Sequence, residues 1–100
     1  MEKDVYRTKD GSAYFEFRFV WVSKLFGGHY EIDIVSMPGY GGRSSGLHAT
    51  HRLPSSRGGH KICFGNNSQV NTLSKAKKWA GVWAEHTWKY ILYGISFPNS

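Results

Sequence analysis

A chain of 100 residues with a net charge of +6 and a single cysteine is limited in fold and function. The length fits one domain over residues 1–100, and 16% aromatic residues can fill a small core without disulfides. Cys63 alone forms no internal disulfide, the start of the chain carries no apolar signal region, and no apolar run approaches the roughly 20 residues that span a bilayer. We therefore expect a cytoplasmic domain with no membrane span.

The first predicted elements form an antiparallel hairpin. Residues 1–13 are polar and charged, which indicates a loosely ordered start or a short edge strand. Apolar and polar residues alternate over 14–22, as in a strand with one buried face. Residues 25–28 predict the turn, and residues 30–34 alternate again. The acidic residues of this second strand share a face with Arg18, so we expect Arg18 to have an acidic partner across the hairpin.

Two segments rich in glycine separate the hairpin from two shorter predicted strands. Residues 37–46 contain too much Gly, Pro and Ser for regular structure and predict a long loop. Residues 47–53 alternate like a strand, residues 54–59 indicate a second turn, and residues 60–64 predict a short strand. Cys63 in this last strand is expected to point away from the core.

The C-terminal part predicts one long helix over residues 72–93. Apolar residues recur there at helical spacing, Asn71 or Thr72 is a suitable N-cap, and Gly94 is a natural stop. Together the segments predict an α+β domain: an antiparallel four-stranded β-meander with one long C-terminal helix packed on the sheet. The exposed edge of such a sheet also offers a surface for a homodimer.

The distribution of charge favours an anionic partner. Between Asp33 and Glu85 the sequence contains no acidic residue, but it contains seven Lys or Arg residues. Such a region attracts nucleic acid or an acidic protein surface, although it also fits a solvated basic surface without a dedicated partner. The sequence predicts a small non-catalytic binding module, and we expect replacement of its basic residues by Glu to abolish binding and spare the fold. The predicted binding residues lie on the acid-free surface between the loop at residues 37–46 and the turn at residues 54–59: Tyr40, Arg43, Arg52, Arg57 and Lys61.

Two short motifs suggest ligands. His48-x-x-His51 and His60-x-x-Cys63 have spacings that occur in structural zinc sites. Residues three apart on an extended strand point to opposite faces, so both pairs chelate only if they lie in turns. We expect no cofactor, with a zinc module as the alternative. Residues 41–46 could cradle a phosphate, but they lack the Gly-Lys-Ser/Thr of a P-loop and precede no predicted helix, which favours an ordinary loop.

The order of landmarks from the first strand to the helix resembles the core of a ubiquitin-conjugating enzyme. Residues 27–34 followed by Pro38 and Tyr40 look like that family's second strand and its Pro-x-x-Tyr-Pro loop. Residues 59–64, Gly-His-Lys-Ile-Cys-Phe, look like its Gly-x-Ile-Cys-Leu around the thioester cysteine. The resemblance implies a second alternative function, in which Cys63 carries a thioester-linked modifier.

A reactive Cys63 needs a nearby base. The sequence offers three candidates: His51, His60 and Lys61. In the resemblance, His51 begins the family's His-Pro-Asn motif, but Arg52 and Leu53 replace the Pro and Asn. The replacement removes the group expected to stabilise the oxyanion during aminolysis. A lone cysteine beside a core strand is also explained by packing alone.

Overall fold

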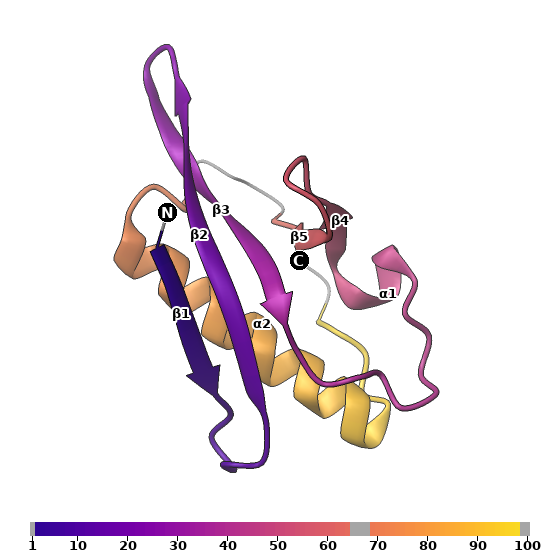
Figure 1. Ribbon diagram of the computed structural model, residues 1–100. Helices are drawn as coiled ribbons and strands as arrows, with labels where there is room; N and C mark the ends of the chain where they lie inside the picture. The colour runs from indigo at the N-terminus through magenta and orange to yellow at the C-terminus, as the bar shows by residue number, and fades with distance from the viewer. Residues whose placement is uncertain (1, 65–68, 99–100) are drawn as a thin grey trace.

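The fold is an antiparallel sheet with one long helix packed across one of its faces. A computed structural model describes residues 2–64 and 69–98. Within these residues five strands stand in the order β1-β2-β3-β5-β4, and each neighbouring pair is antiparallel. The long helix lies behind the sheet in Figure 1. The predicted α+β class and the packed C-terminal helix are confirmed. The elements are β1 (Glu2–Arg7), β2 (Tyr14–Lys24), β3 (Gly27–Ser36), α1 (Leu47–Thr50), β4 (Arg52–Pro54), β5 (His60–Ile62) and α2 (Leu73–Tyr93).

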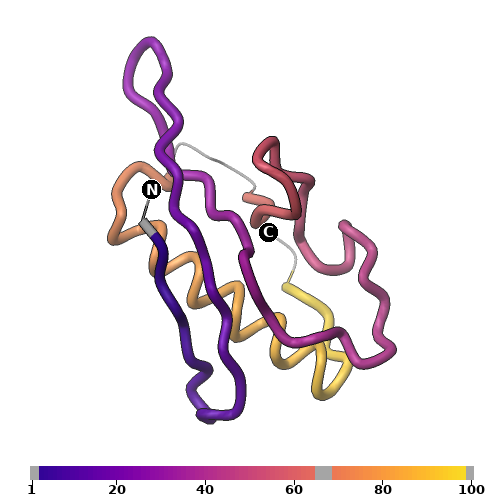
Figure 2. Tube along the Cα trace, viewed as in Figure 1, coloured from indigo at the N-terminus to yellow at the C-terminus, as the bar shows by residue number. Residues whose placement is uncertain are grey.

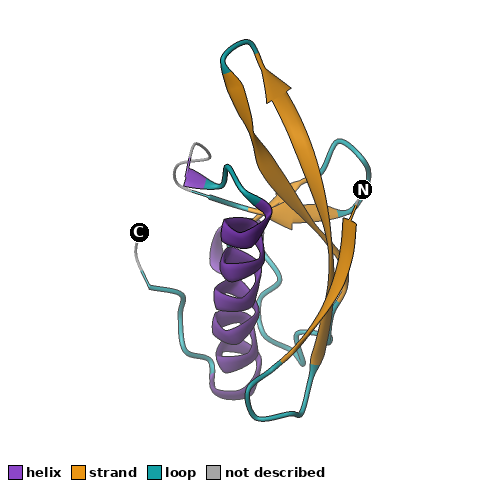
Figure 3. Cartoon of the chain, turned by 90° about the vertical axis from the view of Figure 1, so that its left-hand side faces the viewer, coloured by secondary structure: helices purple, strands orange, loops and turns teal. Residues whose placement is uncertain are grey.

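β2 and β3 form a long hairpin because their apolar residues alternate in step. Phe17 pairs with Ile34, and Phe19 pairs with Ile32, so the helix-facing side of both strands is apolar. The hairpin extends well past the helix in Figure 3. At its tip the turn residues 25–26 place a Leu and a Phe side chain in solvent, 89% and 94% exposed.

Gly28 lies in β3 opposite Ser23 of β2, close to the end of this hairpin. A Cβ atom at this position would lie 2.3 Å from the backbone oxygen of Val22 and 2.8 Å from the ring of Trp21. The Trp21 ring occupies the space above the glycine and also packs edge-on against Tyr30, with 5.1 Å between ring centroids. Position 28 therefore requires glycine for lack of space.

β1 shows that the start of the chain forms a short edge strand, one of the two possibilities that the sequence left open. Residues 2–7 pair with residues 14–19 of β2 and form one edge of the sheet. A carboxylate of α2 fixes this edge, because Glu85 accepts hydrogen bonds from the Tyr6 hydroxyl and, at 2.9 Å, from the Lys9 amide. The polar composition of the segment gives little sign of a strand, because this strand depends on backbone pairing and on this one carboxylate.

Residues 47–53 do not form the predicted strand. The first four form α1, which ends at His51 in the left-handed conformation, with φ of 50°. Thr50 accounts for the difference, because its hydroxyl donates to the carbonyl of Gly46 at 2.8 Å. Its own carbonyl accepts the indole N–H of Trp83 at 3.2 Å. A buried indole needs such an acceptor, and the short helix supplies it.

The last two strands enter the sheet out of chain order. β5 pairs with β3 on one side and with β4 on the other, so β4 forms the outer edge. The four-stranded meander is thus corrected to five strands with β5 inserted between β3 and β4. Ile62 is buried and Cys63 is exposed, as expected from the alternation. The predicted break at residues 65–68 lies outside the described residues.

α2 has the predicted bounds because both of its caps are formed. The Thr72 hydroxyl accepts from the Lys75 amide at 3.1 Å, and Gly94 ends the helix in the left-handed conformation. Alanines on the buried face let the helix approach the sheet, and Trp83 packs edge-on against Phe15 and Phe17. No helix among the described residues is both long and apolar enough to cross a bilayer.

Candidate functional site

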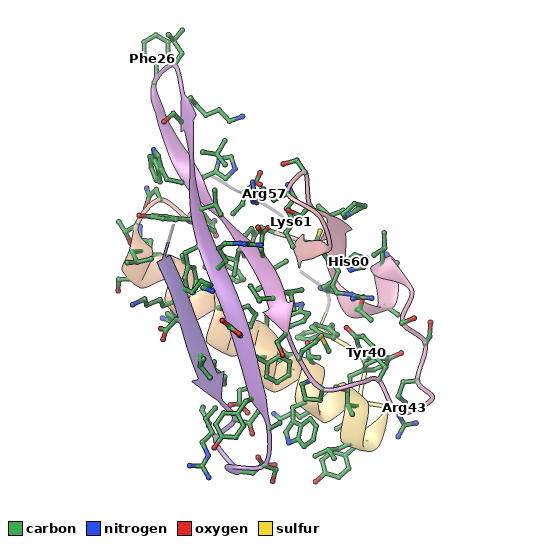
Figure 4. The ribbon with its side chains drawn as sticks, viewed as in Figure 1. Phe26, Tyr40, Arg43, Arg57, His60 and Lys61 are labelled. Carbon is green, nitrogen blue, oxygen red and sulfur yellow. The ribbon has the colours of Figure 1, made fainter. Side chains whose placement is uncertain are left out.

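The sheet face away from α2 carries a compact ionic cluster. Arg57, in the turn between β4 and β5, donates from Nε and Nη2 to the two carboxylate oxygens of Asp33 at 2.6 and 2.8 Å. Its Nη2 also lies 2.8 Å from Glu31, whose other oxygen accepts from Lys61 Nζ at 3.0 Å. Arg18 adds an ion pair to Asp33 at 3.5 Å, which confirms its predicted acidic partner. Figure 4 shows Arg57 and Lys61 together beside β5.

The cluster holds its carboxylates ionised. Burial raises the pKa of Asp33, but hydrogen bonds from Arg57 and Ser55 and the neighbouring positive charges outweigh burial and lower the pKa below its usual 3.8. The pKa of Glu31 is lowered for the same reasons, with Arg57 and Lys61 as its partners. The hydrogen bonds to Asp33 in turn raise the pKa of Arg57. A guanidinium bound in this way is already occupied, so Arg57 does not offer a free anion site.

Arg52 forms a second internal contact group with two other predicted residues. Its Nη2 donates to the carbonyl of Ser45 at 2.7 Å, and its Nε donates to the Thr50 hydroxyl at 2.9 Å. The guanidinium carbon lies 5.1 Å from the ring centroid of Tyr40, a cation–π contact. His60 Nδ1 lies 3.4 Å from Arg52 Nη1. The structure therefore brings Tyr40, Arg52 and His60 together, but as the support of a loop.

Arg43 connects the glycine-rich loop to the C-terminal end of α2. Its guanidinium donates to the carbonyls of Ile91 and Leu92 at 3.4 and 3.5 Å, where a helix carries partial negative charge. The Tyr90 hydroxyl adds a bond to the carbonyl of Ser44 at 2.7 Å. A helix does follow this loop, contrary to expectation, but it has only four residues. The loop thus packs on α2 through Arg43 and through the carbonyl of Ser44.

Cys63 lines a cavity of about 240 Å³ between the end of β5, α2 and the C-terminal segment. Figure 2 shows this segment, in yellow, turning back from the end of α2. His51 stacks on Phe97 at 4.5 Å between ring centroids, and His86 lies 5.8 Å from the same ring. Among the described residues, the wall consists of His51, Ile62, Cys63, Phe64, Trp79, Val82, Trp83, His86, Phe97 and Pro98.

The bases that line the cavity with the Cys63 thiol differ in part from those predicted. His60 and Lys61 are held by Arg52 and Glu31, so neither of these two predicted partners shares the cavity with Cys63. His51 and His86 do share it. Burial and the charges of neighbouring histidines lower the pKa of His51, so its ring stays neutral to a lower pH than usual.

The four predicted zinc ligands are not gathered into one site. Among the residues that the structure describes, no group of three or more His, Cys, Asp or Glu side chains could hold a metal ion. His48 is exposed on α1, whereas His60 lies against Arg52. His51 and Cys63 line the cavity, and the backbone amide of Cys63 donates to the carbonyl of His51 at 2.9 Å.

α2 presents a mixed basic and apolar surface on the side away from the sheet, which we call the outer face. Trp79 and Val82 are 40% and 43% exposed at its centre. Lys78 and Lys89 are exposed and have no ion pair or hydrogen bond with any described residue, and Lys75 contacts only Asn71 through its side chain. The outer face consists of Lys75, Lys78, Trp79, Val82, His86, Lys89 and Tyr93, which project within one arc of the helix.

Trp79, Val82 and His86 are the site residues that sequence analysis missed. Trp79 and Val82 widen the helical apolar stripe and were not counted among the predicted binding residues. The available signal was the width of that stripe, which exceeds what one sheet face covers. The three residues follow a spacing of three and four along the helix, so they form one row.

No protein-family model matches this chain, and neither does any curated protein or solved structure. The resemblance to ubiquitin-conjugating enzymes remains a prediction.

Proposed function

We propose that this protein is a small binding module that recognises an anionic partner, an acidic protein surface or a nucleic acid, through the outer face of α2. One observation carries the proposal. The arginines of the predicted site are bound to internal acceptors, whereas Lys75, Lys78 and Lys89 extend into solvent around exposed apolar side chains. The partner class is the one expected from the sequence, but the proposed surface is different.

The electrostatics of α2 support this surface. Its 21 residues contain one acid, Glu85, and that carboxylate accepts from the Tyr6 hydroxyl and the Lys9 amide. The outer face itself contains no carboxylate, and Glu85 lies at its margin, where it lines one hollow together with Lys78 and Lys89. Exposed charges act over about 8 Å at physiological salt, so Lys75 and Lys78 present a joint positive potential to an approaching anion.

A pair of matched charge reversals tests the proposal. The double variant Lys75→Glu, Lys78→Glu is compared with Lys3→Glu, Lys24→Glu, which changes the net charge equally at exposed lysines of β1 and β2, outside the outer face. The probes are a fluorescent polyglutamate and a single-stranded oligonucleotide, titrated at low and physiological salt. We expect the α2 variant to weaken binding of at least one probe by about tenfold or more, and the control variant to weaken it by less than about threefold.

Two results would overturn the proposal. One is equal weakening by both variants, because binding would then follow net charge alone. The other is the absence of saturable binding to either probe. We expect the α2 variant to fold, because a Glu at position 75 faces the Thr72 cap and suits the first turn of a helix. A change in binding would then not result from unfolding.

The thioester carrier suggested by the resemblance is a second candidate, because the Cys63 thiol is exposed in a cavity with two imidazoles. It requires a thiol that is alkylated faster at neutral pH than the thiol of the unfolded chain. Alkylation at the unfolded rate or slower would exclude it.

A further inference from the structure

The cavity beside Cys63 adds specificity to the outer face of α2. Its ten wall residues include no Asp, Glu, Lys or Arg, and seven of them are Ile, Phe, Val, Trp or Pro. Trp79 and Phe64 form one wall in edge-on contact, with 5.6 Å between ring centroids. An apolar side chain of a partner fits this environment, because it would leave water without stranding a polar group.

The lysines bracket this cavity along the helix. Lys75 and Lys78 precede its α2 wall, which runs from Trp79 to His86, and Lys89 follows it. The distance along the axis from Lys75 to Lys89 is roughly 21 Å, at 1.5 Å per residue. An extended chain covers that distance with about six or seven residues. The spacing therefore suits a short segment with one central apolar residue and an acid on each side.

The cations that remain free favour a peptide over a nucleic acid. Direct readout of bases and bidentate binding of phosphate rely on the planar fork of arginine. Here Arg43, Arg52 and Arg57 donate to internal acceptors. The outer face contains lysines but no arginine. The aromatic side chains at the cavity surround one hollow and do not form the row of stacking platforms that a single-stranded nucleic acid follows.

We propose that the outer face of α2 binds an extended acidic peptide that inserts one aromatic or aliphatic side chain into the cavity between Trp79, Phe64 and Phe97. This inference rests on the proposed function and specifies its partner. The lysines attract the acidic flanks and set the direction of approach, and the cavity selects the residue between them.

The test uses two synthetic peptides of about nine residues, which exceed the bracketed distance slightly. One has a central Phe with Glu residues on both sides, and the other has Ser in place of Phe. We expect the Phe peptide to bind about tenfold tighter or more, which is the gain expected for burying such a side chain. Bound Phe peptide should also slow alkylation of Cys63, because the thiol lines the cavity.

Variants on α2 locate the effect. Val82→Glu places a charge in the cavity wall, and Leu92→Glu makes the same change at a residue of similar exposure outside that wall. We expect Val82→Glu to remove the preference for Phe over Ser and Leu92→Glu to preserve it. Circular dichroism melting of both variants checks that each is folded.

The outcomes separate this inference from the function on which it rests. If the two peptides bind with equal affinity and Lys75→Glu, Lys78→Glu weakens both, the cavity does not select a side chain. The proposal that the outer face binds an anionic partner would then still stand. Binding of the oligonucleotide but of neither peptide would overturn the peptide partner and retain an anionic one. If no probe binds, both proposals fall.

Discussion

The open face of the sheet and the outer face of α2 are both rich in cations, and they use them in opposite ways. On the sheet, Arg57 donates two hydrogen bonds to Asp33 and another to Glu31. On the helix, Lys78 and Lys89 contact no described acid. The difference follows from chemistry, because a guanidinium forms a rigid fork that suits a carboxylate, whereas an ammonium on a flexible stem gains little from being fixed.

The contrast shows that positive charge in the sequence does not locate a binding surface. The segment without acids, between Asp33 and Glu85, supplies cations to both regions. Arg57 and Lys61 bind acids of β3, and Arg43 and Arg52 bind backbone carbonyls. On α2, Lys77 pairs with Asp4, whereas Lys78 and Lys89 have no such pair with a described acid. Replacing the loop arginines by Glu would therefore damage the fold, contrary to the expectation from the sequence.

The largest effect should come from breaking the cluster on the sheet. Arg57→Ala leaves the buried Asp33 with Arg18 as its remaining ion-pair partner, and we expect a loss of about 3 kcal/mol in the free energy of unfolding. Lys78→Ala should change that free energy by no more than about 0.5 kcal/mol, because the side chain is exposed and unpaired. Urea unfolding of both variants measures the difference. Equal losses would mean that the two regions do not differ as described.

A smaller effect should appear in the dependence of stability on pH. Because the folded pKa values of Asp33 and Glu31 are lowered, their contribution is complete at neutral pH and is lost as the pH falls below about 4. Asp33→Asn should lower stability at pH 7 and flatten its decline below pH 4. Glu16→Gln, at an exposed pair 4.0 Å from Lys3, should leave the slope unchanged. A wild-type slope in Asp33→Asn would contradict the assignment.

The smallest effect concerns the helix itself. Lys75 occupies the third position of α2, where a Glu could return a hydrogen bond to the Thr72 cap. We expect Lys75→Glu to raise the free energy of unfolding by about 0.5 kcal/mol, whereas Lys89→Glu should bring no gain so far from the N-terminus. Thermal melting compares the two. A loss of stability in Lys75→Glu would show that the lysine has a structural role.

Local patterns in the sequence predicted much of the fold. The alternation around Phe17 and the caps at Thr72 and Gly94 are properties of neighbouring residues, and they fixed the hairpin and α2 correctly. α1 was missed because it depends on a distant residue, the indole of Trp83, which binds the carbonyl of Thr50. An alternating pattern alone does not reveal such a contact.

The candidate site was less predictable for a related reason. Whether a cation is free depends on partners far away in the chain, as Arg57 and Asp33 show across a separation of 24 residues. The partial exposure of Trp79 and Val82 was not predicted, because helical periodicity does not tell how much of an apolar stripe the sheet covers.

Gly28 has a consequence for how this sequence can vary over evolution. The neighbouring oxygen of Val22 and ring of Trp21 leave no room for a side chain, so selection should hold this position to glycine in any descendant that keeps the hairpin. The tip at residues 25–26 is under no such steric constraint within the fold, since both side chains lie in solvent. The amino-acid sequence should therefore diverge slowly at Gly28 and fast at residues 25–26, unless the tip has a partner of its own.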